Sequence, residues 1–368
     1  MKRIALIGLF LAAALQAPAP ASAADLKIAY GAYGSPTSTL VAHGIIPFID
    51  EAQKLDGTLK FELLSGGAVV GAKTGLSGVR DGLVDAAQIS SIYFPSELPT
   101  MNVTTSLSPG IAADTRAVAA ATTEMTILHC DKCEKELSAW NMKYLGGYGV
   151  SSYSLLCTKP VKTLADLKGL RVRAAGPFGR MATALGMVPA NMTISETYEG
   201  LQRGQIDCTF GSPGWLTSFS IGDVAKNVLL FGMGTAFGGP LIDVSVDKWK
   251  AADDKQKDAL KHAAAVGVIS SAIAYMAADD KVVASAAEKG YSFVKAGSDV
   301  HDVLNKFSKD TRDQVIDHAK ERGIKDADQT VDTFLATLDK WKKIVADAGN
   351  DNQAIIDRLY TEVYAKMK

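Results

Sequence analysis

Charge of one sign is not in excess anywhere in this sequence. Its 368 residues contain 39 Lys and Arg against 40 Asp and Glu, and no run of basic residues stands out. Proteins that bind nucleic acid or anionic lipid surfaces usually carry a basic patch. We therefore expect no nucleic-acid partner and no stable insertion into a membrane.

Recognisable motifs of catalysis are also absent from the sequence. The five histidines are scattered, and neither a G-x-S-x-G elbow nor an H-E-x-x-H zinc motif occurs. Residues 66–74 approach a phosphate-binding loop, but Ala72 separates Gly71 from Lys73 and moves the lysine off the phosphates. We expect a protein that is not an enzyme and that uses no cofactor and no metal.

Long apolar runs are missing after the N-terminus. Lys2 and Arg3 precede an apolar run over 4–15, prolines follow, and 21–23 is Ala-Ser-Ala. This order is typical of a cleaved secretory signal over 1–23, whereas a membrane anchor needs about 20 apolar residues. Without Lys2 and Arg3, 37 basic residues face 40 acidic ones, a net charge of about −3. We expect a soluble protein that works outside the cytoplasm, and the alanine-rich stretch 263–278 reads as a buried helix.

Only four cysteines are present: Cys130, Cys133, Cys157 and Cys208. In an oxidising compartment an even number favours disulfides. Cys130 and Cys133 have C-x-x-C spacing, which fits a local bridge, a redox motif or half of a zinc site. Cys157 and Cys208 lie in apolar strand-like runs and form either a second bridge or two buried thiols.

Strands alternate with helices along most of the chain, which predicts β-α-β units and mostly parallel sheets. A helix over 38–55 should be kinked at Pro47, and a short helix over 163–169 should have Thr163 as N-cap and Gly169 just past its end. Asp247 is expected to cap a helix that starts near Lys248. The predicted strands are 26–30, 59–64, 86–91, two runs within 143–156, 170–174, 205–210 and 291–295.

The last third of the chain is predicted to be helical. A long alanine-rich helix should cover about 254–287. Apolar residues then recur at three- and four-residue steps between Val331 and Val345, which indicates one buried helix face. Trp341 lies on this face and is expected to be a core residue.

Three segments resemble the solute-binding proteins of TRAP transporters. Residues 76–91 are similar to that family's helix, x-x-G-x-V-D and small strand. Residues 166–173, Asp-Leu-Lys-Gly-Leu-Arg-Val-Arg, resemble its D-L-K-G-x-K-x-R signature, and residues 196–207 resemble its E-x-Y-x-A-L-Q-x-G-x-V-D. The segments occur in the family's order, behind a signal peptide.

The resemblance implies a two-domain α/β fold of the Venus flytrap type, with long hinge-spanning and C-terminal helices. Each domain is then a mostly parallel sheet flanked by helices. Domain I is expected at 24–151 plus about 240–280, and domain II at 152–239 plus about 281–325. Residues 326–368 would be C-terminal helices that pack on the domains.

The same resemblance places a carboxylate-binding arginine at Arg173. Its planar guanidinium can bind a carboxylate at two points, which lysine cannot do. An ion pair between Arg173 and Glu196 is the structural alternative. In place of the family's Asn-Pro this chain has Gly211-Ser212-Pro213, so the amide that assists the arginine is missing. Further expected ligand-binding residues are Tyr33, Ser90, Ser91, Tyr93, Tyr153, Phe178, Ser212, Trp215 and Phe237.

The function implied is that of a monomeric periplasmic receptor that captures a small organic acid and delivers it to the membrane subunits of a TRAP transporter. Three alternatives stay open at this point. The ligand could be uncharged or cationic, the receptor could serve an ABC importer or a sensor, or the fold could carry a periplasmic enzyme.

Overall fold

The computed structural model describes residues 24–367, so the predicted signal peptide over 1–23 lies outside the described residues. Near the N-terminus, a parallel sheet has the strand order β2-β1-β3. Its strands are β1 (Leu26–Gly31), β2 (Leu59–Leu64) and β3 (Ala86–Ala87). The strand predicted over 86–91 is thus shorter than expected, because the chain leaves the sheet after Ala87 and Ser91–Tyr93 turns into a short 3-10 helix.

The helix predicted over 38–55 is divided in two. A π-helical turn, η1 (Val41–Ile45), leads into α1 (Ile46–Leu55), and Pro47 lies in the first turn of α1. Proline is tolerated there because the first N–H groups of an α-helix have no intrahelical acceptor. The interruption thus falls ahead of Pro47, within η1.

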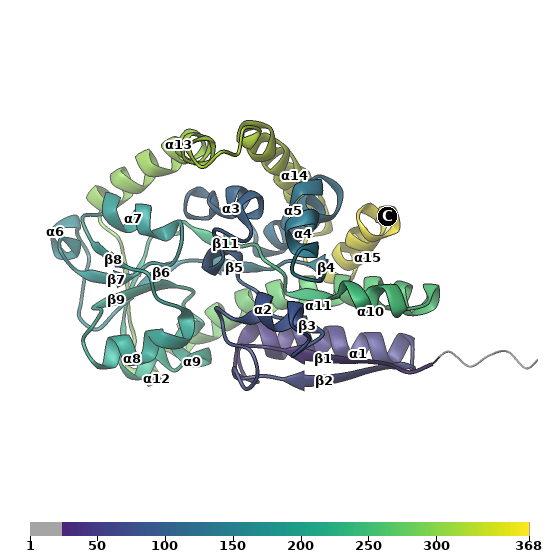
Figure 1. The fold of residues 1–368 in the computed structure, drawn as a ribbon. Coiled ribbons are helices and arrows are strands. Elements are labelled where there is room, and N and C mark those ends of the chain that lie inside the picture. The colour runs from purple at the N-terminus through teal and green to yellow at the C-terminus, as the bar shows by residue number, and fades with distance from the viewer. Residues whose placement is uncertain (1–23, 368) are drawn as a thin grey trace, which may run out of the picture.

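A second, six-stranded sheet lies on the other side of the molecule (Figure 1). Its order is β13-β10-β6-β9-β7-β8, and β6 runs antiparallel to both neighbours while the other pairings are parallel. Its strands are β6 (Ser154–Cys157), β7 (Arg171–Arg173), β8 (Val188–Ala190), β9 (Cys208–Gly211), β10 (Asn227–Leu230) and β13 (Ser292–Lys295).

Two antiparallel strand pairs, β12–β4 and β11–β5, lie between the two sheets in space (Figure 1). The segment 143–156 therefore contributes to three strands, where two runs were predicted. These strands are β4 (Met142–Gly146), β5 (Gly149–Ser152), β11 (Thr235–Phe237) and β12 (Ile242–Ser245).

Shorter helices flank both sheets. α6 begins at the predicted N-cap Thr163, which forms a capping box with Asp166, and Gly169 follows the helix with φ of 75°. The prediction for α10 was wrong: its N-cap is Ser245, which accepts the Lys248 N–H, so Asp247 already lies in the first turn. These helices are α2 (Gly75–Arg80), α3 (Pro99–Thr105), α4 (Thr115–Leu128), α5 (Asp131–Ser138), α6 (Leu164–Leu167), α7 (Phe178–Ala184), α8 (Thr197–Gln202), α9 (Trp215–Ser218) and α10 (Val246–Ala251).

The long helix α11 (Asp254–Ala284) runs from one side of the molecule to the other. It ends three residues before the predicted boundary, and α12 (Ala286–Lys289) follows. By length and composition α11 could cross a membrane, but 61% of its most apolar window is buried. It reads as a core helix, as predicted for 263–278. Gly267 allows a close approach, because a Cβ there would lie 2.8 Å from the Gly44 carbonyl oxygen of η1.

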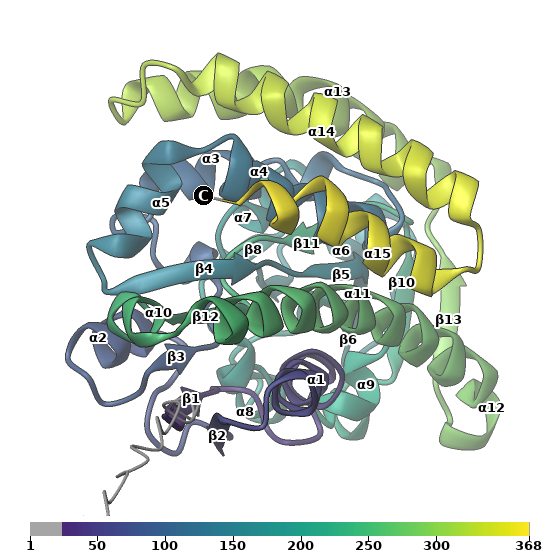
Figure 2. The ribbon, with the colours of Figure 1, turned by 90° about the vertical axis from the view of Figure 1, so that its right-hand side faces the viewer.

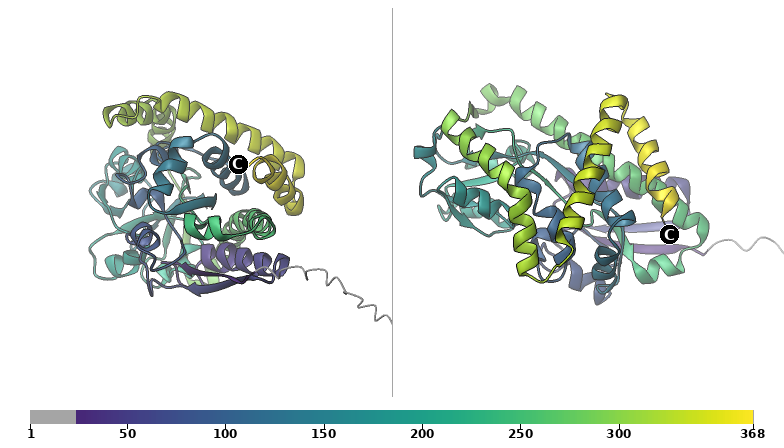
Figure 3. Two further views of the ribbon diagram at one scale, coloured as in Figure 1. Left: turned by 45° about the vertical axis from the view of Figure 1, so that its right-hand side comes forward. Right: turned by 90° about the horizontal axis from the view of Figure 1, so that it is seen from above.

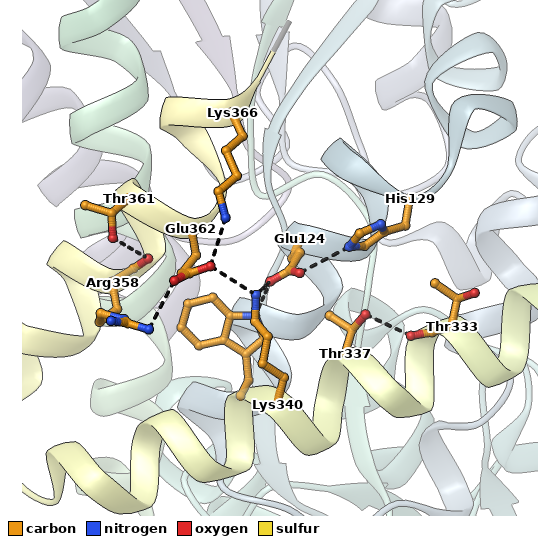
Figure 4. A network of polar contacts seen from close by, with 10 residues as sticks. Glu124, His129, Thr333, Thr337, Lys340, Arg358, Thr361, Glu362 and Lys366 are labelled. Carbon is orange, nitrogen blue, oxygen red and sulfur yellow. Dashed lines mark hydrogen bonds and ion pairs between the residues drawn. The ribbon is translucent and has the colours of Figure 1, made fainter.

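Three C-terminal helices cover the outside of the domains (Figures 2 and 3). They are α13 (Ser298–Glu321), α14 (Ala327–Ala348) and α15 (Asn352–Glu362). The predicted apolar face of α14 packs on α4, and Trp341 is completely buried on it. The Trp341 indole N–H donates to Glu124 at 2.7 Å, and Glu124 also binds Lys340 and His129 (Figure 4).

Both pairs of cysteines are joined in disulfides. Cys130 and Cys133 bridge the start of α5. Cys157 and Cys208 face each other across β6 and β9 and tie these strands together. Since both bridges need an oxidising compartment to persist, they agree with export from the cytoplasm.

A buried carboxyl group lies where β12 meets β3. Asp243 is fully buried, and its Oδ1 accepts the Ala87 N–H at 2.9 Å. Within residues 24–367, its Oδ2 has no hydrogen-bond partner. Burial raises the pKa of Asp243 to about 8, because removal from water disfavours the charged form.

Stability should therefore fall as the pH rises through neutrality. The pKa of Asp243 is higher in the folded protein than in the unfolded chain, so its stabilising effect is complete below about pH 4 and is lost towards pH 8. Between pH 6 and 7 this one group should lower the free energy of unfolding by about 1.4 kcal/mol. Asp243→Asn keeps an oxygen acceptor for Ala87 and should remove this decline in denaturant unfolding.

The exposed Asp81→Asn is the matched control, since the pKa of Asp81 is already lowered by its bond to Arg80 and no titration occurs above pH 6. An equal decline in the wild type and in Asp243→Asn would contradict the assignment.

Candidate ligand-binding site

A cavity lies between segments that follow strands of the first sheet, such as those of Tyr33 and Gln88, and segments of the six-stranded side, such as that of Arg173. Its empty volume is about 600 Å³, which suits a small ligand. Eight of the predicted site residues line it: Tyr33, Ser90, Tyr93, Tyr153, Arg173, Phe178, Trp215 and Phe237.

Arg173 ends β7 and turns its guanidinium into this cavity, where the residue is only 3% exposed. Its Nε donates to the Met192 carbonyl at 3.1 Å, and its Nη2 donates to the Tyr93 hydroxyl at 3.0 Å. A longer contact of 3.4 Å joins Nη1 to the Phe210 carbonyl. All three acceptors are neutral, and no carboxylate of the described residues lies within 4.0 Å of the guanidinium.

The alternative ion pair with Glu196 does not form. Glu196 instead accepts the backbone N–H and the hydroxyl of Thr193, both at 2.7 Å, in a capping box. These bonds lower the pKa of Glu196. Arg171, two residues before Arg173, has a side chain that is 47% exposed and pairs with Asp207 at 3.0 Å. One strand thus carries a satisfied surface arginine and a buried arginine without a counter-ion.

Tyr93 connects the two sides of the cavity. It lies after the first sheet, at the end of the short helix Ser91–Tyr93. Its hydroxyl accepts both the Arg173 Nη2 and the backbone N–H of Ile194, at 3.0 and 3.1 Å. Both donors belong to the six-stranded side, and they follow Tyr93 by about 80 and about 100 positions in the chain. This single phenol thus links the two sides of the cavity.

Aromatic rings form the wall beside Arg173. Tyr153 packs on Phe178 and Trp215 with ring centroids 4.7 and 5.3 Å apart, and the guanidinium carbon lies 5.6 Å from the indole centroid. Gly211 makes this wall possible, because a Cβ there would come within 2.3 Å of the Trp215 ring. The chain's departure from the Asn-Pro pattern thus coincides with room for a tryptophan.

Two phenols of the cavity keep free hydrogen-bonding capacity. In the described part of the chain, the hydroxyls of Tyr33 and Tyr153 have no hydrogen-bond partner, and burial raises the pKa of each. Burial also raises the pKa of Tyr275. Tyr148 differs, because its hydroxyl and that of Ser90 lie 2.8 Å apart. Because their pKa values are raised, these phenols are neutral at pH 7, and each hydroxyl can both donate and accept a hydrogen bond.

Two predicted site residues do not line the cavity. The Ser91 hydroxyl pairs with that of Thr105 at 3.1 Å. The Ser212 hydroxyl donates to Asp279 at 2.5 Å, and Ser151 donates to the same carboxylate at 2.6 Å. Burial raises the pKa of Asp279. Both hydroxyls are thus bound inside the protein, away from the lining of the cavity.

Sequence reasoning missed more than half of the lining. Tyr275 comes from the middle of the alanine-rich α11, where periodicity indicates only core. Tyr148 is flanked by Gly147 and Gly149, a local signal that could have been used. The residues missed are Ser38, Leu40, Gln88, Ile92, Ser108, Tyr148, Val150, Ile194, Phe219, Ala236 and Tyr275.

The cavity is poor in charged and metal-binding side chains. Arg173 is the one charged residue among its described lining residues. Over residues 24–367, no group of three or more His, Cys, Asp or Glu is arranged to hold a metal ion. The geometry is suited to binding an anion.

Residues 33–321 match the family model described as bacterial extracellular solute-binding protein, family 7, or DctP. The chain belongs to the DctP family of TRAP solute-binding proteins. Members of this family are binding proteins and not enzymes. Family membership places the chain among periplasmic binding proteins.

Curated relatives match only part of this DctP protein. The 2,3-diketo-L-gulonate-binding periplasmic protein YiaO of Escherichia coli is 28% identical over 50% of this chain and 56% of its own length. A solute-binding protein of Albidiferax ferrireducens is 26% identical over 49% of this chain and 52% of its own length. The chain thus spans about half the length of the curated relatives it matches.

Solved structures confirm the two-domain α/β fold over most of the chain. A TRAP solute-binding protein of Rhodoferax ferrireducens with copurified benzoate has a TM-score of 0.76 at 17% identity, covering 87% of this chain and 99% of that one. A TRAP solute-binding protein of Bordetella bronchiseptica with bound mandelate has a TM-score of 0.70 at 24% identity, covering 85% of this chain and 99% of that one. The periplasmic ectoine-binding protein of Halomonas elongata has a TM-score of 0.71 at 14% identity, with the same two coverages of 85% and 99%.

Proposed function

We propose that this DctP protein captures a small organic acid in the cavity and delivers it to a TRAP permease. The observation that carries the proposal is Arg173: a buried guanidinium whose three acceptors are all neutral. Burying an unpaired charge is strongly unfavourable. A ligand carboxylate bound at two points would supply the missing counter-ion.

Closure around the ligand would be a hinge motion of the two predicted domains, with domain I at 24–151 plus about 240–280 and domain II at 152–239 plus about 281–325. Residues 326–368 would pack on both. Ser90 and Tyr93 then belong to one domain and Arg173 to the other. A ligand that contacts both sides favours the closed form by its differential affinity.

The named relatives support an acid without specifying it. Benzoate, mandelate and D-glucuronate are bound by three solved relatives, whereas a fourth binds ectoine. The cavity of this chain carries a cation and no described acidic side chain, which favours an anionic ligand over a cationic one.

We further propose that the chain is exported by cleavage after residue 23 and acts as a monomer in the periplasm. The two disulfides support an oxidising compartment.

Ligand that copurifies with the protein tests the proposed function. Native mass spectrometry of protein isolated without denaturation should show a small-molecule adduct, and denaturation should release a carboxylic acid identifiable by its mass and fragments. Release of an amine or of an uncharged compound as the sole ligand would contradict the proposal.

A further inference from the structure

The described lining of the cavity carries one positive charge and no negative charge, which restricts the charge of the ligand. Arg173 is the one cation among the described lining residues, and neither Asp nor Glu lines the cavity. Resting on the proposed function, we infer that the site selects ligands that carry a single negative charge, with the rest of the ligand uncharged but able to form hydrogen bonds.

The nearby acidic groups are not available to hold a cationic group of the ligand. Glu196 is bound by Thr193. Asp279 accepts the hydroxyls of Ser151 and Ser212 and the Gly214 N–H, at 2.6, 2.5 and 2.7 Å. An ammonium group in the cavity would therefore have only aromatic faces to contact.

A second cation is likewise missing from the described lining residues. Arg180 in α7 belongs to another hollow, formed by α3 and α13, and donates from Nη2 to the Ser106 carbonyl at 3.1 Å. Arg171 pairs with Asp207 at the surface. A second carboxylate would lose its hydration and meet phenols and aromatic rings instead of a cation, which is unfavourable for an ionised group.

Neutral hydrogen-bonding groups remain to contact the body of the ligand. Trp215 and Ser108 line the cavity and are more than nine-tenths buried, and within the described chain Trp215 Nε1 and Ser108 Oγ have no partner. The phenols of Tyr33 and Tyr153 add two more groups. Buried polar groups are usually satisfied, so a ligand with hydroxyl, oxo or similar neutral substituents complements them.

Pairs of probes with equal shape and unequal charge test the selection. 4-Nitrobenzoate and terephthalate differ by one charge at nearly constant shape, as do succinamate and succinate. At pH 8, calorimetry should show the monoanion binding at least about tenfold more tightly than the dianion, in whichever pair binds. Equal affinity, or tighter binding of the dianion, would overturn the inference and leave the proposed function intact.

If no probe binds, the charge of the copurified acid decides. One ionised carboxylate on an otherwise uncharged molecule supports the inference, and two carboxylates contradict it. Failure of every probe together with an absence of any copurified acid would instead overturn the proposed function, and with it the charge selection.

An amide probe separates charge from shape. Wild-type protein should prefer 4-nitrobenzoate to 4-nitrobenzamide by at least about tenfold, or prefer the copurified acid to its amide where neither probe binds. Arg173→Gln should abolish this preference, whereas Arg171→Gln, on the exposed end of the same strand, should retain it. If Arg173→Gln still preferred the acid to its amide, Arg173 would not be the group that recognises the negative charge of the ligand.

Discussion

Replacing Arg173 by glutamine is expected to lower the affinity for the carboxylate ligand about a hundredfold or more. That corresponds to about 2.7 kcal/mol, within the range seen when one partner of a buried charge pair is removed. Arg173→Lys should lose at least roughly tenfold, because an ammonium group cannot form the two-point contact of a guanidinium. Isothermal titration calorimetry with the copurified acid measures both changes.

Arg171→Gln is the matched control, since it removes an arginine from the same strand but from the surface. Its affinity should stay within about twofold of the wild type. The unliganded Arg173→Gln protein should be as stable as the wild type or more so, because it buries one unpaired charge fewer. Unchanged ligand affinity in Arg173→Gln would refute the anchoring role.

Trp341→Ala should destabilise the protein by about 3–5 kcal/mol, the usual range for deleting a large buried aromatic side chain. Trp341 is fully buried, and its indole N–H binds a Glu124 carboxylate that also receives Lys340 at 2.6 Å (Figure 4). The substitution leaves both a cavity and a buried carboxylate with one donor fewer. Denaturant unfolding of the unliganded protein gives the difference.

Trp249→Ala serves as the control for this prediction. Trp249 is half-buried on α10, where its ring lies 5.9 Å from the Lys257 ammonium group, so a clearly smaller loss is expected. Trp341→Phe should fall between wild type and Trp341→Ala, because the ring is kept and the hydrogen bond is lost. Equal losses for Trp249→Ala and Trp341→Ala would contradict the assignment of α14 as a core helix.

The elements that could be predicted from the sequence are those with strong local signals. β1 and β2 follow from apolar alternation, α6 from the Thr163–Asp166 capping box, and α14 from its three- and four-residue apolar spacing. Boundaries failed where two local signals compete. Ser245 and Asp247 are both good N-caps, and only the backbone geometry shows that Ser245 accepts the N–H of Lys248.

The site was predictable only in part. Arg173 stands in a recognisable signature, and loop aromatics such as Trp215 were reasonable choices. Ser91 and Ser212 lie outside the lining, and a sequence does not show that a hydroxyl already has an internal partner. Tyr275 was missed since it stands in an alanine-rich helical run, and it reaches the cavity only through the path of α11.

The position of the ligand's carboxylate relative to Arg173 is the most direct measurement of how this protein works. In a crystal structure of the loaded protein, we expect both carboxylate oxygens within about 2.7–3.0 Å of guanidinium nitrogens of Arg173. A ligand that lacks a carboxylate, or one whose carboxylate lies elsewhere while Arg173 keeps only Tyr93, Met192 and Phe210 as acceptors, would contradict the proposed function.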